Sequence, residues 1–169
     1  MKAKKWKGLL VGTLLTTVSA IPLPAIAGAN VGEEAPALSI DLINGGEASV
    51  AEHLGKRPVY LKFWATWCQY CVEEMPHLQS SFKKYGDKLA VIAVNVGLND
   101  SEGNIKKLFS ERNFDIPVAI DQKGEMTRSY SVIGTPTHVL IDKKGVVRYR
   151  SHLVTDQLDE LLAVLIEEN

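Results

Sequence analysis

The hydrophobic and polar positions of this chain follow patterns that predict alternating strands and helices. Two nearly continuous apolar runs, Pro58–Ala65 and Leu89–Val96, predict strands that are covered on both faces. Between them, the apolar residues of Gln69–Tyr85 recur every three or four positions, which is the period of an amphipathic helix. Pro76 falls inside this segment, so we expect the helix to be kinked there.

The other segments extend this pattern to the whole body of the chain. Leu38–Ile43 is followed by Asn44-Gly45-Gly46, a turn signal that predicts a hairpin. The further predicted elements are a helical turn at Ala51–Leu54, helices at Glu102–Phe114 and Glu125–Tyr130, a strand at Ile116–Ile120, a hairpin of Thr137–Asp142 with Val146–Tyr149, and an amphipathic helix at Asp156–Glu167. This order implies an α/β domain with a mixed central sheet and helices on both faces.

The beginning of the chain has a different pattern. Met1–Lys7 is basic, Gly8–Ile21 is uncharged and mostly apolar, and an Ala-Ile-Ala sequence ends at Ala27. This order is typical of a secretory signal peptide with its cleavage site. An uncleaved anchor is the alternative, because residues 8–27 reach the length of about 20 residues that a membrane span needs.

Charge separates the same two parts. The 169 residues include 19 Lys and Arg and 20 Asp and Glu, for a net charge of −1, but residues 1–27 carry +4 and residues 28–169 carry −5. We therefore divide the chain into a signal peptide or anchor, 1–27, and one domain, 28–169. Lysines before the apolar run predict that the body lies outside the cytoplasm, in the periplasm, with membrane contact only through an uncleaved N-terminal segment. The acidic body argues against a nucleic-acid partner.

The two cysteines, Cys68 and Cys71, form a C-x-x-C motif where the predicted strand passes into the next helix. Backbone N–H groups at a helix start favour a thiolate, which is the attacking species in disulfide exchange. The motif therefore favours a redox-active disulfide in which Cys68 attacks and Cys71 resolves the mixed disulfide. Two alternatives stay open. One is a structural disulfide, although so short a loop restrains little chain entropy; the other is half of a zinc site, although the four histidines show no paired spacing.

The stretch Tyr60–Leu78, YLKFWATWCQYCVEEMPHL, resembles the active-site segment of the TlpA/ResA-like (CcmG-like) family of exported thiol-disulfide oxidoreductases. Gly134–Asp142 is similar to a second segment of that family, G-x-P-T followed by L-I-D. The resemblance covers about Gly32 to Asn169. It implies a thioredoxin fold with an N-terminal hairpin extension and a TlpA-type central insertion between Val96 and Thr127.

The resemblance also implies partners and roles. Protein disulfides would be the substrates, with apocytochrome c as one client, and a membrane thiol protein of the DsbD or CcdA kind would donate electrons without a cofactor or metal. Pro136 would be a cis-proline beside the disulfide, which leaves the Thr135 backbone free to pair with a substrate strand. Trp67 would shield the cysteines and offer the substrate an apolar platform. Glu74 would assist proton transfer; the alternative is a solvent-exposed helix carboxylate.

Two positions depart from the family pattern. Tyr70 stands where the family usually has proline, as in glutaredoxin-like sites, and this predicts a reduction potential somewhat above that of thioredoxin. Lys62 interrupts the predicted buried strand, where a lysine must pair, reach the surface or lose its proton. Lys62 either tunes the pKa of the cysteines or bonds a carboxylate such as Glu74 or Glu73 without affecting catalysis.

Two further functions would use the same residues. A disulfide oxidase or isomerase would run the Cys68–Cys71 pair in the opposite direction, and a non-enzymatic metal-delivery module would use both cysteines and His138. We favour the reductase, and we expect His138 to be a packed strand histidine. The remaining histidines are expected at helix or sheet-edge surfaces: His53, His77 and His152.

If the signal peptide is cleaved, the exported protein should begin after Ala27 and contain 142 residues. Intact-mass measurement on the exported protein tests this. A mass that still includes residues 1–27 would support the anchor instead.

Overall fold

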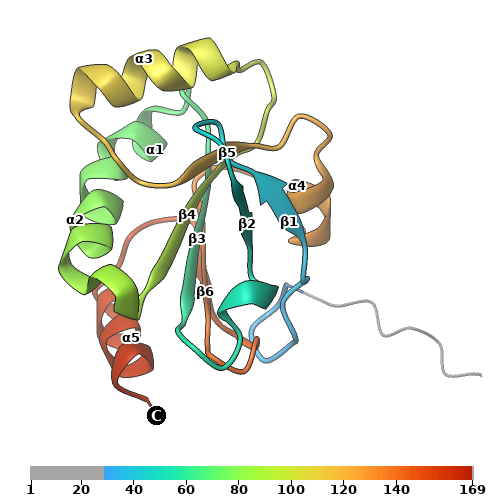
Figure 1. Cartoon of the computed structure of the whole chain (residues 1–169), viewed down its shortest axis with the longest axis vertical. Helices are drawn as coiled ribbons and strands as arrows, with labels where there is room; N and C mark the ends of the chain where they lie inside the picture. The colour runs from blue at the N-terminus through green and yellow to red at the C-terminus, as the bar shows by residue number, and fades with distance from the viewer. Residues whose placement is uncertain (1–28, 169) are drawn as a thin grey trace, which may run out of the picture.

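A computed structural model describes residues 29–168, so the predicted signal peptide lies outside the described part. Its central sheet has the strand order β5-β4-β3-β6-β7 (Figure 1). Strands β3, β4 and β5 run parallel to one another. Strand β6 is antiparallel to β3, and β7 is antiparallel to β6. The strands are β3 (Val59–Trp64), β4 (Ala90–Asn95), β5 (Val118–Ile120), β6 (Thr137–Ile141) and β7 (Val147–Ser151). The predicted mixed sheet is thus confirmed.

Helices and a hairpin cover the two faces of this sheet (Figure 1). One face carries α1 (Gln69–Glu73), α2 (Met75–Tyr85), α3 (Glu102–Arg112) and α5 (Asp156–Glu167). The other carries the predicted hairpin, formed by β1 (Ser39–Asp41) and β2 (Glu47–Ser49), and α4 (Glu125–Ser129). Two short 3₁₀ turns complete the fold, η1 (Ala51–His53) and η2 (Gly86–Lys88).

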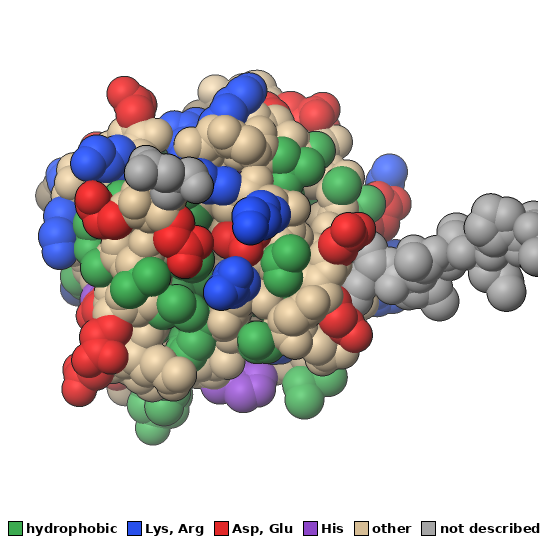
Figure 2. Space-filling view, turned by 90° about the horizontal axis from the view of Figure 1, so that it is seen from below, with side chains coloured by type: hydrophobic (Ala, Val, Ile, Leu, Met, Phe, Trp, Pro, Cys, Tyr) green, Lys and Arg blue, Asp and Glu red, His purple; other side chains and the backbone are tan. Residues whose placement is uncertain are grey.

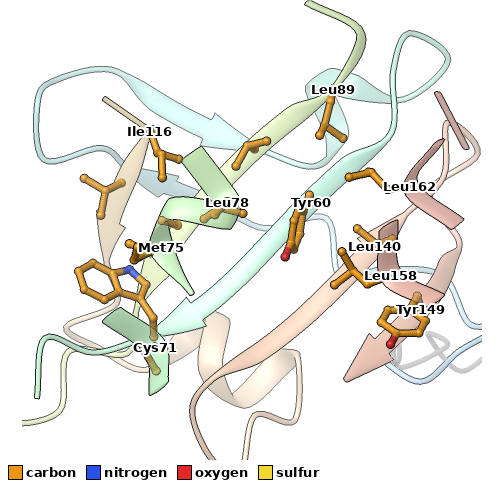
Figure 3. Close-up of a cluster of buried hydrophobic side chains, with 14 of the residues drawn as sticks. Tyr60, Cys71, Met75, Leu78, Leu89, Ile116, Leu140, Tyr149, Leu158 and Leu162 are labelled. Carbon is orange, nitrogen blue, oxygen red and sulfur yellow. The ribbon is translucent and has the colours of Figure 1, made fainter. Parts of the chain in front are cut away.

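Residue alternation along β3 divides the core into two clusters. Tyr60 and Trp64 face α1, α2, α3 and α5, while Leu61 and Phe63 face the hairpin and α4. Because both faces are covered, every residue of β3 is buried, as its continuous apolar run predicts. Figure 3 shows the first cluster, in which Leu78 of α2 and Leu158 and Leu162 of α5 pack beside Tyr60 and Leu140 of the sheet. Lys62 lies on this same helix-covered face.

The single kinked helix expected over Gln69–Tyr85 is instead two helices. α1 ends at Glu73 and α2 begins at Met75, with Glu74 between them. Pro76 falls in the first turn of α2, where no N–H donor is needed, so it starts a helix rather than bending one. The hydrophobic period runs on across the break, which is why the pattern does not reveal it.

The histidine positions agree with the sequence in part. His152 is exposed, and His77 is partly exposed with its Nε2 2.8 Å from Asp159 Oδ1. The surface position expected for His53 is wrong, because only 8% of this residue is exposed. The η1 turn packs His53 against the protein, where its Nδ1 accepts a hydrogen bond from Arg57 Nε at 3.3 Å.

The surface opposite α1 carries both signs of charge. Figure 2 shows this face from below, with Lys and Arg side chains interspersed among Asp, Glu and hydrophobic ones. Such a mixture differs from the uniformly basic surface that nucleic-acid phosphates bind. Over residues 29–168, no helix is both long and apolar enough to cross a membrane.

Tyr130 joins the end of α4 to the segment that precedes β1. It is fully buried, its ring centroid lies 5.5 Å from that of Phe63, and its hydroxyl donates to the carbonyl of Pro36 at 2.9 Å. A buried carbonyl that loses its donor has no water to replace it. This bond therefore fastens the N-terminal segment to the sheet.

We expect Tyr130→Phe to lower the free energy of unfolding by about 1–2 kcal/mol, because it leaves the Pro36 carbonyl unpaired without changing the packed ring. Denaturant unfolding of the oxidised protein measures this loss. The matched control is Tyr70→Phe, which removes a hydroxyl from a residue that is 66% exposed and should change stability little. Equal effects of the two substitutions would contradict the role of the Pro36 bond.

Candidate active site

The two cysteines form a disulfide at the start of α1. Their Cα atoms are 5.2 Å apart, and Cys68 is the N-cap residue, with its Sγ accepting a hydrogen bond from the Cys71 N–H at 3.3 Å. Cys68 is 9% exposed and Cys71 is completely buried. Cys68 is therefore the more exposed of the two cysteines, and a backbone donor is in place to favour its thiolate.

The Thr135–Pro136 peptide bond is cis, as the family resemblance implies. It lies just before β6, and the pairing of Phe63 with Thr137 places it at the end of β3 from which the chain leads to the cysteines. The bend thus brings Thr135 and Pro136 to the same end of the sheet as Cys68.

Exposed apolar side chains surround this end of the sheet. Trp67, 53% exposed, precedes Cys68, and its Nε1 donates to the carbonyl of Leu98 at 2.7 Å. Four further apolar residues are at least half exposed: Tyr70, Leu98, Ile133 and Leu153. Tyr70 lies between the cysteines, Leu98 accepts the Trp67 hydrogen bond, Ile133 shortly precedes the cis-proline, and Leu153 precedes Val154, whose N–H binds Glu74. We call these five residues the apolar rim; the exposure of Trp67 beside Cys68 is compatible with the platform that the sequence predicts.

Asp100 fixes the turn before the cysteines, and sequence reasoning did not single it out. Its carboxylate accepts hydrogen bonds from the Thr66 N–H (2.7 Å), the Thr66 hydroxyl (2.9 Å), Asn95 Nδ2 (2.7 Å) and the Ser101 N–H (2.9 Å). Partial burial opposes ionisation of Asp100, but these donors outweigh it and lower its pKa. Ser101 is itself the N-cap residue of α3, where its hydroxyl accepts a hydrogen bond from the Asn104 N–H.

Lys62 lies behind Cys71 with none of its surface exposed. Its Nζ donates to the backbone carbonyl of Cys71 at 3.1 Å and lies 3.4 Å from Glu74 Oε2. Burial lowers the pKa of Lys62 to about 8, although Glu74 partly offsets the effect. The lysine therefore pairs, and its partner is Glu74; Glu73, the other candidate, accepts a hydrogen bond from Gln69.

Glu74 is the centre of a buried polar network. Its Oε1 accepts from the Val154 N–H at 2.8 Å, and its Oε2 lies 3.0 Å from His138 Nε2. On the other side of the ring, His138 Nδ1 is 2.8 Å from the Tyr60 hydroxyl. Burial lowers the pKa of His138 and raises that of Tyr60, so a neutral imidazole donates to Glu74 and accepts from the tyrosine.

These contacts decide the charge of Glu74. Burial works against its ionisation, but hydrogen bonds from His138 and Val154 and the charge of Lys62 outweigh that effect and lower its pKa to about 2. The alternative of a solvent-exposed helix carboxylate is wrong, because only 16% of the Glu74 side chain is exposed. Because the helix is interrupted at Glu74, this side chain can turn inward instead of lying on an exposed helix surface.

His138 is a packed strand histidine, as expected, and it is completely buried. Both ring nitrogens have hydrogen-bonding partners, and both cysteine sulfurs are joined in the disulfide. His138 is therefore engaged by Tyr60 and Glu74 within the polar network. Over the described residues, no group of three or more His, Cys, Asp or Glu side chains is placed to hold a metal.

Comparison with known proteins adds the family. A model of the AhpC/TSA family matches residues 31–150. The chain belongs to the AhpC/TSA family. The thioredoxin-like protein YneN of Bacillus subtilis is 38% identical over 122 residues, which are 72% of this chain and 71% of that protein. The thiol-disulfide oxidoreductase ResA of Bacillus thuringiensis is 34% identical over 135 residues, 78% of this chain and 76% of that protein.

Solved structures share the fold. A Chlorobium tepidum protein assigned as the thiol:disulfide interchange protein DsbE aligns with a TM-score of 0.71 and 28% identity, over 81% of this chain and 98% of its own. The exposed lipoprotein thioredoxin Etrx1 of Streptococcus pneumoniae aligns with a TM-score of 0.66 and 27% identity, over 78% and 98%. With the C-x-x-C disulfide at the start of α1, these relatives identify the chain as a thiol-disulfide oxidoreductase of thioredoxin-like fold.

The low pKa of Glu74 makes the stability of the oxidised protein depend on pH. Because the folded-state pKa, about 2, is below the ordinary value of 4.5, the stabilisation is present above pH 4.5 and is lost as the pH falls toward 2. We expect Glu74→Gln to cost about 2–4 kcal/mol at pH 6, where it leaves Lys62 without its counter-charge. The difference from wild type should shrink as the pH is lowered through this window.

Denaturant unfolding at several pH values measures the effect. The matched control is Glu73→Gln, at the exposed last residue of α1, which should follow wild type throughout. A constant difference between Glu74→Gln and wild type from pH 6 to pH 2 would contradict the assigned charge.

Proposed function

We propose that this oxidoreductase reduces protein disulfides outside the cytoplasm, with Cys68 as the attacking and Cys71 as the resolving cysteine. The observation that carries the proposal is the unequal burial of the two cysteines at the start of α1. A substrate disulfide can contact Cys68, whereas the buried Cys71 acts only in the intramolecular attack on the mixed disulfide.

The reaction takes place in two exchanges, starting from the reduced pair. The Cys68 thiolate attacks one sulfur of the client disulfide, forms a mixed disulfide, and expels the other client sulfur as a thiolate that takes a proton from water. Cys71 then loses its proton and attacks Cys68 Sγ, which restores the Cys68–Cys71 disulfide and releases the second client thiol. The client gains two electrons and two protons, and the cysteine pair is oxidised.

The client segment would dock beside the cis-proline. Thr135 offers its backbone to an extended client strand, and Pro136 has no N–H that would compete for the bond. The apolar rim, with Trp67 nearest to Cys68, would cover hydrophobic residues on either side of the client cysteine. Such a site recognises extended, partly unfolded chain rather than one particular sequence.

Location and partners follow from the N-terminal sequence and from the family. The proposed signal peptide, 1–27, would deliver the domain to the periplasm, and a membrane thiol protein of the DsbD or CcdA kind would return the pair to its reduced state. Relatives named ResA and DsbE support a thiol-disulfide role, and Etrx1 is described as an exposed lipoprotein. Apocytochrome c before haem attachment is the client class that we propose first.

The mechanism predicts different outcomes for the two cysteine variants. Cys71→Ser should accumulate a mixed disulfide with a disulfide-containing peptide, because the attack remains and the resolution is lost. Cys68→Ser should lose at least about a thousandfold in peptide reduction, since the buried Cys71 cannot meet the substrate. Non-reducing electrophoresis with mass spectrometry, and single-turnover reduction, measure the two outcomes.

Full activity of Cys68→Ser, or failure of Cys71→Ser to trap the peptide, would refute the assignment of the two roles. The direction of electron flow is tested separately, by the redox state of the pair in cells. A reductase should be held reduced and should become oxidised when its thiol donor is deleted; a pair that stays oxidised with the donor present would favour the oxidase or isomerase.

A further inference from the structure

We propose that Lys62 is a positioning residue for the resolving step: its ammonium charge, held behind Cys71 by Glu74, favours the Cys71 thiolate that attacks the mixed disulfide. This inference rests on the proposed function and deepens it, because it concerns only the second of the two exchanges.

Forming a thiolate costs more at the resolving cysteine than at the attacking one. Cys71 is completely buried, and burial without a nearby cation favours the neutral thiol, which does not attack disulfides. Cys68 keeps 9% of its surface exposed and accepts a backbone N–H. Some group must therefore lower the cost of the Cys71 thiolate.

Lys62 is placed to do this. Alternation along β3 turns its side chain to the face that α1 covers, and its Nζ is 3.1 Å from the carbonyl oxygen of Cys71 itself. A unit charge beside the residue that carries the buried thiolate acts through a medium of low effective dielectric constant, where its influence is several times that in water. Glu74, whose side chain is closer to the protein surface than that of Lys62, lies with its Oε2 3.4 Å from the same ammonium.

The rest of the network keeps that charge in place. Glu74 stays ionised because His138 and the Val154 N–H donate to it, so it supports a protonated lysine and is a poor proton acceptor at neutral pH. At pH 7 Lys62 remains mostly protonated, since its pKa is about 8. The titratable groups around Lys62 come from five elements and the α1–α2 junction: Cys71, Glu74, His138, Tyr60, and, beyond them, the pair His77 and Asp159.

In the resolving step, the Cys71 S–H bond breaks and the proton passes to water or buffer. The thiolate forms the bond to Cys68 Sγ, the bond between Cys68 and the client sulfur breaks, and the client sulfur leaves with the electron pair and is protonated. Lys62 keeps its own protons throughout. Its charge lowers the energy of the thiolate before the attack.

The test separates the two exchanges in time. Reduced protein is mixed with a symmetric nitrobenzoate disulfide whose released thiol is coloured: the first equivalent appears when Cys68 attacks, and the second appears when Cys71 resolves. The variants are Lys62→Met, which removes charge and donor, and Lys62→Gln, which removes the charge but keeps a donor for the Cys71 carbonyl. The control is Lys88→Met, at a lysine whose side chain is 69% exposed.

We expect both Lys62 variants to slow the second, first-order phase about tenfold at pH 7 and to raise its half-maximal pH by about one unit. The first, bimolecular phase should stay within about twofold of wild type. Equal slowing of both phases, no slowing of the second, or wild-type behaviour of Lys62→Gln would each overturn the proposal, the last because it would assign the effect to hydrogen bonding.

A second measurement keeps Lys62 itself in place. In Cys68→Ser, titration of the remaining thiol should give Cys71 a pKa below the ordinary value of about 8.5, and a value at or above it would overturn the proposal. Failure of the proposed function is distinguishable from these outcomes, because it requires that the wild-type protein leave protein disulfides unreduced.

Discussion

The hydrogen bonds to one carboxylate hold together the parts of the molecule on which the site depends. Glu74 lies between α1 and α2, and it binds Lys62 of β3, His138 of β6 and the Val154 N–H from the loop after β7. Two strands, a helix junction and a loop therefore meet at a single, largely buried anion. Each donor makes the anion more stable, and the anion in turn allows a lysine to lie where water does not reach.

The sheet topology explains why the chemistry gathers at one end. The chain leaves β3 into the C-x-x-C segment, the cis-proline precedes the antiparallel β6, and the loop after the parallel β4 supplies Asp100. These three segments are far apart in sequence, but the register of β3 with its two neighbours places them at one end. The active-site turn is then fixed by Asp100 through the backbone and hydroxyl of Thr66.

The sequence predicts most of the fold because local signals suffice for it. Continuous apolar runs identify the buried strands β3 and β4, and helical spacing identifies α5. The C-x-x-C motif and the family resemblance locate the cysteines and the cis-proline. The break at Glu74 escapes such reasoning, since the hydrophobic period runs through it and a proline in the first turn of a helix resembles one in its interior.

The polar network could not be predicted for a different reason. Tyr60 and His138 are 78 residues apart, and Thr66 and Asp100 are 34 apart. Their contacts depend on strand register, which sequence patterns leave open. Lys62 was conspicuous as a charge in an apolar run, but two carboxylates were candidates for its partner, and only the helix break decides between them.

In the proposed mechanism, the unequal burial of the two cysteines also fixes the kinetic order of client release. Once a client is joined to Cys68, the only competitor for that sulfur inside the protein is Cys71, whose Cα lies 5.2 Å away. A reactant tethered at this distance acts at a high effective concentration that dilution in the surrounding compartment does not change. The lifetime of the mixed disulfide is then a property of the enzyme, independent of how scarce the client or any external thiol becomes.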